Sequence, residues 1–132
     1  MRMVVGHGVD LVELADFERL LHRFGGETDA RSFTEGELAY AGQGDARTAR
    51  LATRFAAKEA VLKALGTGWV TGLSWKDIEI VSAQNGAPAV VLSGGVERLA
   101  HSRGVTEILV SLTHTSSYAI ASVIALGGSK EP

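Results

Sequence analysis

The chain has 132 residues, of which 45 % are hydrophobic and 21 % are charged, and its formal net charge at pH 7 is −2. This length excludes a second full domain, and the hydrophobic fraction excludes a disordered chain. The mild negative charge argues against a general nucleic-acid binder. We therefore expect one domain over residues 1–132.

Targeting and membrane segments are not expected. The N-terminal residues reach Asp10 before the apolar region of a signal peptide could form. The long uncharged stretch at residues 108–128 is interrupted by polar side chains between residues 111 and 117, so it is not a span of about 20 apolar residues. The chain has no cysteine, which excludes disulfides and thiolate zinc sites. We expect a cytoplasmic protein.

The N-terminal segment predicts a buried strand. Residues 4–12 are rich in valine and are interrupted by Gly6 and Gly8. Glycine inside a strand marks a close approach of another backbone. We expect this strand to end near Asp10 and a helix to follow.

Three helices are predicted next. Apolar residues repeat every three or four positions over residues 14–24, and two glycines then supply a stop signal. Ser32 or Thr34 can cap a shorter helix that has acidic residues in its first turn. The longest helix spans residues 48–65, is rich in alanine and has Gly66 as its C-terminal cap.

The second half of the chain predicts two hairpins and a short helix. The first hairpin pairs residues 78–81 with residues 89–92, and Asn85-Gly86 is its turn signal. A short helix follows at residues 96–102. The second hairpin pairs residues 108–113 with residues 118–126. The predicted order is one strand, then several helices, then mostly antiparallel strands. This order is typical of the α+β class.

The long helix carries a stripe of basic residues. Arg47, Arg50, Arg54 and Lys58 are spaced by three or four positions. They share one helix face, on which like charges repel. An anionic ligand would relieve this repulsion, whereas a solvated face whose long side chains cover apolar surface would need no ligand. The pattern leaves both interpretations open.

Two carboxylates stand out by their positions. Asp10 lies at the end of an apolar strand, and Glu59 lies at the edge of the apolar stripe of the long helix. Two carboxylates beside a basic face suit Mg²⁺, which bridges protein oxygens to a phosphate. Alternatively, Asp10 caps the following helix, and Glu59 pairs with Lys63 four residues later. The residues alone leave these alternatives open.

His114 ends a strand at the tip of the last hairpin, where a side chain can face a cleft. A solvated or turn-stabilising histidine is the alternative. The four histidines of the chain have no metal-ligand spacing and no cysteine companions, so we expect no structural zinc site.

Taken in order, these segments resemble the family of holo-acyl-carrier-protein synthases, the small 4′-phosphopantetheinyl transferases. Two motifs carry the resemblance, GHGVDLVE at residues 6–13 and the more specific RFAAKEAVLKALGTG at residues 54–68. Shorter supporting pieces are DIEI at 77–80, NGAP at 85–88 and VSLTH at 110–114. The similarity runs from about residue 4 to residue 125.

The resemblance implies an α+β fold in which a mostly antiparallel sheet packs on a long central helix, with shorter helices around it. It implies transfer of the 4′-phosphopantetheine arm of coenzyme A to a serine of an apo acyl carrier protein, in fatty acid biosynthesis. The other product is adenosine 3′,5′-bisphosphate. The resemblance further implies a requirement for Mg²⁺ and a homotrimer with a site between neighbouring subunits. From the charge and the hydropathy pattern described above, we expect no nucleic-acid and no membrane partner.

The resemblance also assigns roles to residues. Asp10 and Glu59 fall on the metal-ligand positions of the family. Lys63 would hold or protonate the leaving phosphate, and Glu59 or a metal-bound water would take the proton of the carrier serine. The residues expected to hold coenzyme A phosphates are Arg54, Lys58 and His114, of which His114 is also counted with the catalytic group. The residues expected to line its adenosine half are Gly66, Asn85, Pro88 and Thr115. Arg54 and the 85–88 turn are expected to serve a site that the next chain completes.

The first helix departs from the family pattern. Many relatives carry an arginine early in this helix to meet an acidic carrier helix, whereas this chain has the sequence ADFE at residues 15–18. Arg19, His22 and Arg23 lie further along the helix and are candidate replacements.

Two other classes of protein compete with the enzyme. One is a non-catalytic trimeric module that binds coenzyme A or a nucleotide. The other is a structural trimer whose arginine stripe pairs with acidic residues of a neighbouring chain. The presence of Asp10, Glu59 and Lys63 favours the enzyme, because a module that only binds has less need of two carboxylates beside an anion.

Overall fold

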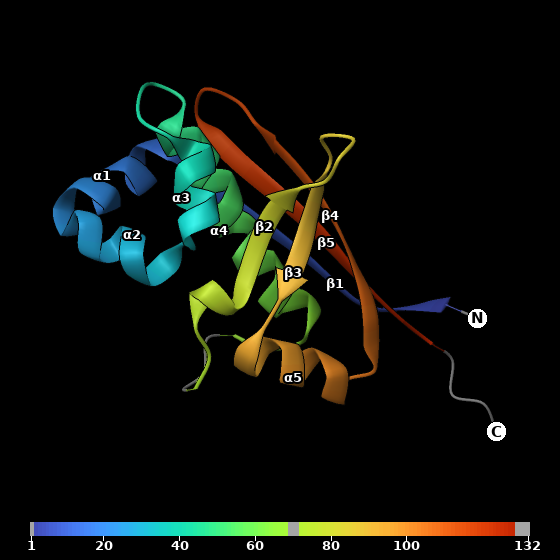
Figure 1. The fold of residues 1–132 in the computed structure, drawn as a ribbon. Helices are drawn as coiled ribbons and strands as arrows, with labels where there is room; N and C mark the ends of the chain where they lie inside the picture. The colour runs from blue at the N-terminus through green and yellow to red at the C-terminus, as the bar shows by residue number, and fades with distance from the viewer. Residues whose placement is uncertain (1, 69–71, 129–132) are drawn as a thin grey trace.

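A long helix lies against a three-stranded antiparallel sheet at the centre of the molecule (Figure 1). The computed structural model describes residues 2–68 and 72–128. The sheet has the strand order β1-β5-β4, with β1 at Arg2–Glu13, β4 at Val105–His114 and β5 at Tyr118–Gly128. The helix is α4 (Arg47–Ala64), which contacts both β1 and β5. This arrangement confirms the predicted α+β fold.

The remaining elements surround this central pair (Figure 1). The helices that precede α4 are α1 (Leu14–Phe24), α2 (Gly26–Ser32) and α3 (Glu35–Ala41). The elements that follow it are the 3₁₀ helix η1 (Trp75–Asp77), the antiparallel pair β2 (Ile78–Ser82) and β3 (Pro88–Leu92), and α5 (Gly94–Ser102). No helix within residues 2–68 and 72–128 has the length and apolar character that a bilayer span requires. The expected cytoplasmic location stays a prediction.

The main differences from the sequence prediction concern the first strand and the helices that follow it. The first strand continues through Asp10 and ends at Glu13, because β1 pairs with β5 along its whole length. Asp10 is therefore inside a strand rather than at its end. Helix α2 was not expected, because the glycine pair suggested only a stop. Gly25, with φ 59°, ends α1, and Gly26 begins α2 directly after it.

The predicted caps are confirmed where the local sequence encodes them. The Thr34 hydroxyl accepts from the Glu37 amide at 3.2 Å, and the Glu37 carboxylate accepts from the Thr34 amide at 3.0 Å, which forms a capping box at the start of α3. After α4, Gly66 has φ 77°, and its amide donates to the Lys63 carbonyl at 2.9 Å. Glycine suits this position because φ is positive there.

Glycine and alanine allow β1 and α4 to pack closely. A Cβ atom at Gly6 would lie 1.8 Å from the carbonyl oxygen of Ala64, and one at Gly8 would lie 2.0 Å from that of Ala60. Both alanines are buried. No side chain larger than hydrogen fits at the two glycines, so the expected close backbone approach is confirmed. It brings Asp10, two residues after Gly8, against α4.

The two faces of the sheet differ in burial. The face against α4 presents buried alanines and a valine from β5, which are Ala119, Ala121, Val123 and Ala125. The opposite, outward face of the sheet carries exposed apolar side chains from all three strands. They are Val9 and Leu11 of β1, Leu109 of β4 and Ile120 of β5. His7 lies on this outward face, opposite Ile124. We call this surface the outward sheet face.

Candidate active site

Asp10 and Lys63 form an ion pair between β1 and α4. The Lys63 ammonium donates to Oδ1 of Asp10 at 3.0 Å and to the carbonyl oxygen of Val9 at 2.9 Å. The side chain of Asp10 is only 11 % exposed, whereas that of Lys63 is 52 % exposed. The ammonium is thus held at the site and still accessible to an incoming anion. The alternative that Asp10 caps α1 is wrong, because the N-cap is Glu13 and no side chain caps the helix.

Glu59 lies one helical turn before Lys63 on α4 and is partly buried. Burial raises the pKa of the Glu59 carboxyl, the negative charge of Asp10 raises it further, and Lys63 opposes both effects. The two carboxylates are therefore close enough for their charges to repel. The Lys63 ammonium hydrogen-bonds to Asp10, not to its helical neighbour Glu59. A second cation near the pair would remove the remaining repulsion.

The donor set fits a hard divalent cation. Mg²⁺ is usually held by one or two carboxylates and completes its coordination with water and phosphate oxygens. Asp10 and Glu59 supply two such carboxylates. Among the residues that the structure describes, no group of three or more His, Cys, Asp or Glu side chains could hold a metal. The carboxylate pair therefore suits an ion that a phosphate-bearing substrate helps to bind.

A shallow hollow leads to Glu59 from the side of α1. Its lining comes from the end of β1, from α1 and from α4, and consists of Leu11, Val12, Glu13, Asp16, Phe17, Leu20, Phe55 and Glu59. Most of these side chains are apolar. Glu59 thus lies beside an apolar surface, and burial is the largest cause of its raised pKa.

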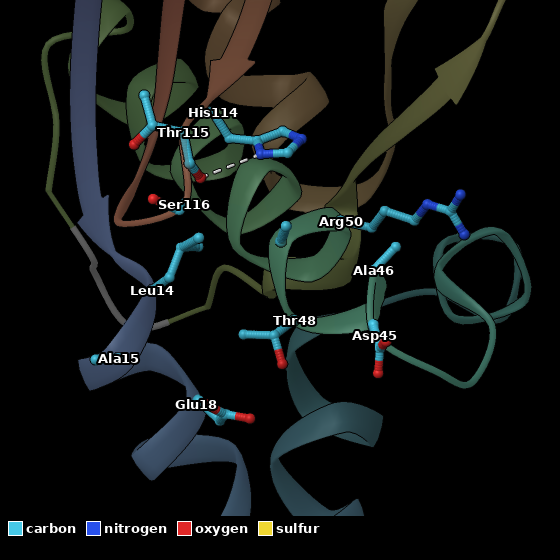
Figure 2. A pocket seen from close by; sticks show the side chains of 11 residues that line it. Leu14, Ala15, Glu18, Asp45, Ala46, Thr48, Arg50, His114, Thr115 and Ser116 are labelled. Atoms are coloured by element: carbon cyan, nitrogen blue, oxygen red, sulfur yellow. Dashed lines mark hydrogen bonds between the residues drawn. The ribbon is translucent and has the colours of Figure 1, made fainter.

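A larger hollow, of about 870 Å³, lies at the N-terminal end of α4 (Figure 2). Three segments line it: the start of α1, the start of α4 with the residues just before it, and the β4–β5 turn. The lining residues are Leu14, Ala15 and Glu18, then Asp45, Ala46, Thr48, Ala49 and Arg50, then His114, Thr115 and Ser116. The turn is held by the Thr115 hydroxyl, which accepts from the amides of Ser117 and Tyr118 at 3.1 Å each. His114 and Thr115, which are neighbours in the chain, both line this hollow, and their predicted contacts with coenzyme A stay a prediction.

Arg50 borders the same hollow and was not among the predicted site residues. Its guanidinium extends away from Leu14 and Glu18 (Figure 2). The sequence signal that could have identified Arg50 is the basic stripe, of which it is an exposed member.

Two members of the basic stripe are neutralised within the chain. Arg47 pairs with Asp29 of α2 at 2.5 Å, and Lys58 pairs with Glu37 of α3 at 2.8 Å. The ammonium of Lys58 also donates to the carbonyl oxygens of Trp75 and Ile78. Neither of the two predicted interpretations, an anion-binding face or a solvated face, therefore applies to the whole stripe. Acidic residues of neighbouring helices neutralise the charges of two of its four members.

The prediction that Lys58 holds a coenzyme A phosphate is corrected by this environment. Both side chains of the Lys58–Glu37 pair are 0 % exposed. Burial lowers the pKa of the Lys58 ammonium, and Glu37 opposes this effect by charge and hydrogen bonding. Because the ammonium is enclosed and already serves three acceptors, Lys58 is a structural residue that ties α4 to α3 and β2.

Arg54 has a different environment. It is 7 % exposed, its Nη1 donates to the Thr53 hydroxyl at 3.1 Å, and its buried Nε has no hydrogen-bond partner. Its guanidinium lies over the ring of Tyr40 and borders a small hollow between α3 and β2. Among the described ion pairs, none involves Arg54. A buried cation with an unused donor is costly unless it binds an anion, so Arg54 stays a candidate for a phosphate ligand.

The other predicted coenzyme A residues lie elsewhere in the chain. Gly66 follows the C-terminal end of α4, and Asn85 and Pro88 lie in the β2–β3 hairpin. None of the three lines the hollow at Glu59 or the hollow at His114. Among the hollows formed by the part of the chain that the structure describes, neither these two nor the hollow between α3 and β2 contains all the predicted ligand residues.

The candidate carrier-docking residues on α1 are mostly paired within the helix. Arg19 bonds to Asp16, and Nε2 of His22 lies 4.0 Å from Glu18. The guanidinium of Arg23 lies over the ring of Phe24. The acidic residues that interrupt the family pattern thus reduce the positive charge of this surface.

Comparisons with known proteins match almost the whole chain. The family model for the 4′-phosphopantetheinyl transferase superfamily matches residues 6–123. A holo-[acyl-carrier-protein] synthase of Solibacter usitatus is 43 % identical over 122 residues, which cover 92 % of this chain and 98 % of that protein. A protein of the same name from Desulforudis audaxviator is 43 % identical and covers 97 % of each chain.

Solved structures extend the similarity to the fold. Holo-[acyl-carrier-protein] synthase from Neisseria meningitidis superposes with a TM-score of 0.85 at 32 % identity, over 93 % of this chain and 98 % of that one. The enzyme from Helicobacter pylori, solved in complex with coenzyme A, superposes with a TM-score of 0.80 at 28 % identity, over 90 % and 98 % of the two chains.

Proposed function

This chain belongs to the 4′-phosphopantetheinyl transferase superfamily. On that premise, we propose how its residues carry out the transfer of 4′-phosphopantetheine. The protein moves the 4′-phosphopantetheine group of coenzyme A to a serine of an apo acyl carrier protein and releases adenosine 3′,5′-bisphosphate. The observation that supports this function best is the cluster of Asp10, Glu59 and Lys63 between β1 and α4.

The proton of the carrier serine goes to Glu59. The serine oxygen forms a bond to the phosphorus that carries pantetheine, and the anhydride bond to the second phosphate breaks. A carboxylate whose pKa lies above its ordinary value is a stronger base, and burial together with Asp10 raises the pKa of Glu59. In the metal-free site Glu59 is therefore the group in the cluster best suited to accept the proton. If Glu59 instead holds Mg²⁺, a water next to the ion would take the proton in its place.

Lys63 acts on the leaving phosphate. Its ammonium is exposed, whereas its partner Asp10 is largely enclosed, so the ammonium can donate to a phosphate oxygen in front of the site. A charge-assisted hydrogen bond there stabilises the negative charge that develops as the anhydride bond breaks. The same ammonium can supply a proton to the departing oxygen.

We further propose that Asp10 and Glu59 hold Mg²⁺. When bound, the ion would neutralise charge on the pyrophosphate of coenzyme A. Support comes from the carboxylate donor set and from the repulsion that raises the pKa of Glu59. Arg54 and His114 hold further phosphates of coenzyme A, and its adenosine half contacts Gly66, Asn85, Pro88 and Thr115.

The working unit is a homotrimer with sites between neighbouring chains. Support comes from the described hollows, none of which gathers the predicted ligand residues of one chain, and from the exposed apolar side chains of the outward sheet face. A second and third copy would cover this face and could bring the scattered ligand residues together.

The transfer is tested by mass spectrometry of the carrier. The protein is mixed with coenzyme A, Mg²⁺ and apo acyl carrier proteins, including one from fatty acid synthesis, and the carrier is expected to gain the mass of one phosphopantetheine. Glu59→Ala should abolish the gain and Lys63→Ala should slow it, whereas Glu97→Ala, at an exposed position of α5, serves as the matched control. Chelation of Mg²⁺ should stop the reaction.

Failure of every carrier to gain mass would overturn the proposed enzyme. Coenzyme A binding without transfer would then favour a non-catalytic module. Unchanged rates in both the Glu59 and the Lys63 variants would show that the reaction takes place at another site.

A further inference from the structure

Two guanidinium groups from α4 lie over one aromatic ring of α3. The Cζ atom of Arg54 is 4.1 Å from the ring centroid of Tyr40, and that of Arg50 is 5.5 Å from it. The two arginines are one helical turn apart, so their charges repel. The negative face of the ring attracts both. Tyr40 is therefore placed to decide how both side chains point.

Hydrogen bonds do little to orient these two arginines. Arg54 donates only to the neighbouring Thr53 hydroxyl among the described contacts, and its Nε is buried without a partner. Arg50 reaches the carbonyl oxygen of Ala41 at 3.5 Å, the limit of a weak hydrogen bond. The contact with Tyr40 is thus the main interaction that holds the planes of the two guanidinium groups.

The ring itself is carried by a firmly anchored helix. The capping box of Thr34 and Glu37 fixes the start of α3. The carboxylate of Glu37 then bonds to the buried ammonium of Lys58 at 2.8 Å and to the amide of Ile80 at 2.8 Å. Tyr40 follows Glu37 by three residues and lies on the next turn. Helix α3 cannot shift along α4 without breaking a buried ion pair, so the ring has a set position over the arginines.

The two arginines border separate hollows. Arg54 borders the hollow between α3 and β2, and Arg50 borders the hollow that contains His114 and Thr115. A guanidinium binds phosphate best when its plane is presented in a defined orientation. A single ring that orients both groups would therefore prepare two anion contacts at once.

We propose that Tyr40 is a positioning residue that orients Arg54 and Arg50 toward the phosphate groups of coenzyme A. This inference rests on the proposed function, in which coenzyme A is the phosphate-bearing substrate. Tyr40 acts through the arginines and takes no part in the transfer step. It should therefore affect the binding of coenzyme A and the KM for it, but not kcat.

The first test measures coenzyme A binding by calorimetry. Tyr40→Leu is expected to weaken binding about 3-fold to 30-fold and to raise the KM by a similar factor, with kcat within about twofold of the parent. Tyr40→Phe keeps the ring face and should bind coenzyme A as the parent does. A kcat loss without a change in binding would overturn the inference.

Phe24→Leu is the matched control. Phe24 and Tyr40 are each 49 % exposed, and each has an arginine over its ring. The ring of Phe24 lies on α1, however, where no predicted coenzyme A residue is located. Its loss should leave coenzyme A affinity unchanged, and an equal effect of the two variants would overturn the inference.

A second background isolates the link to Arg54. In an Arg54→Met protein, the fold-loss of affinity caused by Tyr40→Leu should be smaller than in the parent, because one of the oriented groups is absent. An equal or larger loss would show that Tyr40 acts by another route. Fluorinated phenylalanine at position 40 keeps the shape of the ring and weakens its negative face, so it provides the same test if Tyr40→Leu does not fold.

The outcomes separate this inference from the proposed function. If the parent modifies a carrier and Tyr40→Leu binds coenzyme A as tightly as the parent, only the role of Tyr40 is overturned. If the parent binds coenzyme A with the expected dependence on Tyr40 but modifies no carrier, the transfer reaction fails and the role of Tyr40 stands.

Discussion

Glu59 is partly buried beside Asp10, and both conditions disfavour its ionised form. The folded protein therefore keeps a charged carboxylate at a cost in stability, which a substrate or metal offsets only when it binds. Sites that are tuned for proton transfer commonly show this conflict between function and stability.

Replacement of Glu59 by glutamine should expose this cost. The pKa of Glu59 is higher in the folded than in the unfolded protein, so its contribution to stability is fully present below the unfolded pKa and is lost as the pH rises through the folded pKa. Glu59→Gln should therefore raise the thermal unfolding temperature in metal-free buffer at pH 8. The difference from the parent should shrink as the pH falls below about 4.5, the ordinary value for this carboxyl.

Mg²⁺ provides the complementary measurement. It should raise the unfolding temperature of the parent and have a smaller effect on Glu59→Gln, because a ligand stabilises only the form that binds it. The prediction would be contradicted if Glu59→Gln unfolded at a lower temperature than the parent at pH 8, because the substitution is expected to raise that temperature.

At the scale of single residues, the sequence predicted the spatial cluster of the proposed catalytic residues better than it predicted the partners of the basic stripe. Asp10, Glu59 and Lys63 lie in motifs whose residue types suit the chemistry, and the structure brings them together. Helical spacing correctly placed Lys58 on one face with Arg54, but spacing within a helix does not show what packs against that face. The partner of Lys58 is Glu37 of another helix, which periodicity cannot identify.

At the scale of elements, the position of the site depends on the close contact of β1 with α4. Asp10 lies on the strand, and Glu59 and Lys63 lie on the helix. Gly8 permits the contact because any Cβ there would collide with the backbone of α4. The strand and the helix could not approach in this way if both carried ordinary side chains.

Gly8→Ala should therefore lower the free energy of unfolding by about 3 kcal/mol or more, because the clash is with backbone rather than with a flexible side chain. Urea denaturation followed by circular dichroism would measure this change. Gly26→Ala is the matched control, since a Cβ there meets nothing within 4 Å, and it should change the stability by less than about 1 kcal/mol. Equal midpoints for the two variants would contradict the packing argument.

Most elements were predictable because their signals are local. Alternation in strands, spacing of three and four in helices, the capping box and the glycine after α4 all act over a few residues. Helix α2 was missed because it starts directly after Gly25, where the glycine pair also signals the end of α1. The full extent of β1 was missed because pairing with β5 carries the strand past Asp10.

At the scale of the whole molecule, the outward sheet face explains the high hydrophobic content of so short a chain. Val9 and Leu11 of β1 are 46 % and 57 % exposed there, and Leu109 of β4 is 47 % exposed on the same face. Contiguous exposed apolar side chains commonly mark a protein interface. In the proposed trimer, other copies of the chain cover this face.

A charge on the outward sheet face should therefore prevent assembly. Val9→Lys is expected to convert the trimer to monomers, measured by light scattering after size exclusion, and to reduce transfer because the shared sites are lost. Val91→Lys is the matched control, since Val91 is 49 % exposed on β3, outside the three-stranded sheet. A monomeric parent, or equal assembly of the two variants, would contradict the proposed interface.

The sequence by itself determined the fold class, most of the elements, and the motifs that contain Asp10, Glu59 and Lys63, because these depend on residue type and on spacing along the chain. Only the tertiary structure decided which charges meet. Lys63 reaches Asp10 across 53 residues of sequence, and Lys58 is enclosed with Glu37 instead of facing a ligand. Burial and pairing between distant elements set the role of an ionisable side chain, and neither is encoded in the spacing of residues on one helix.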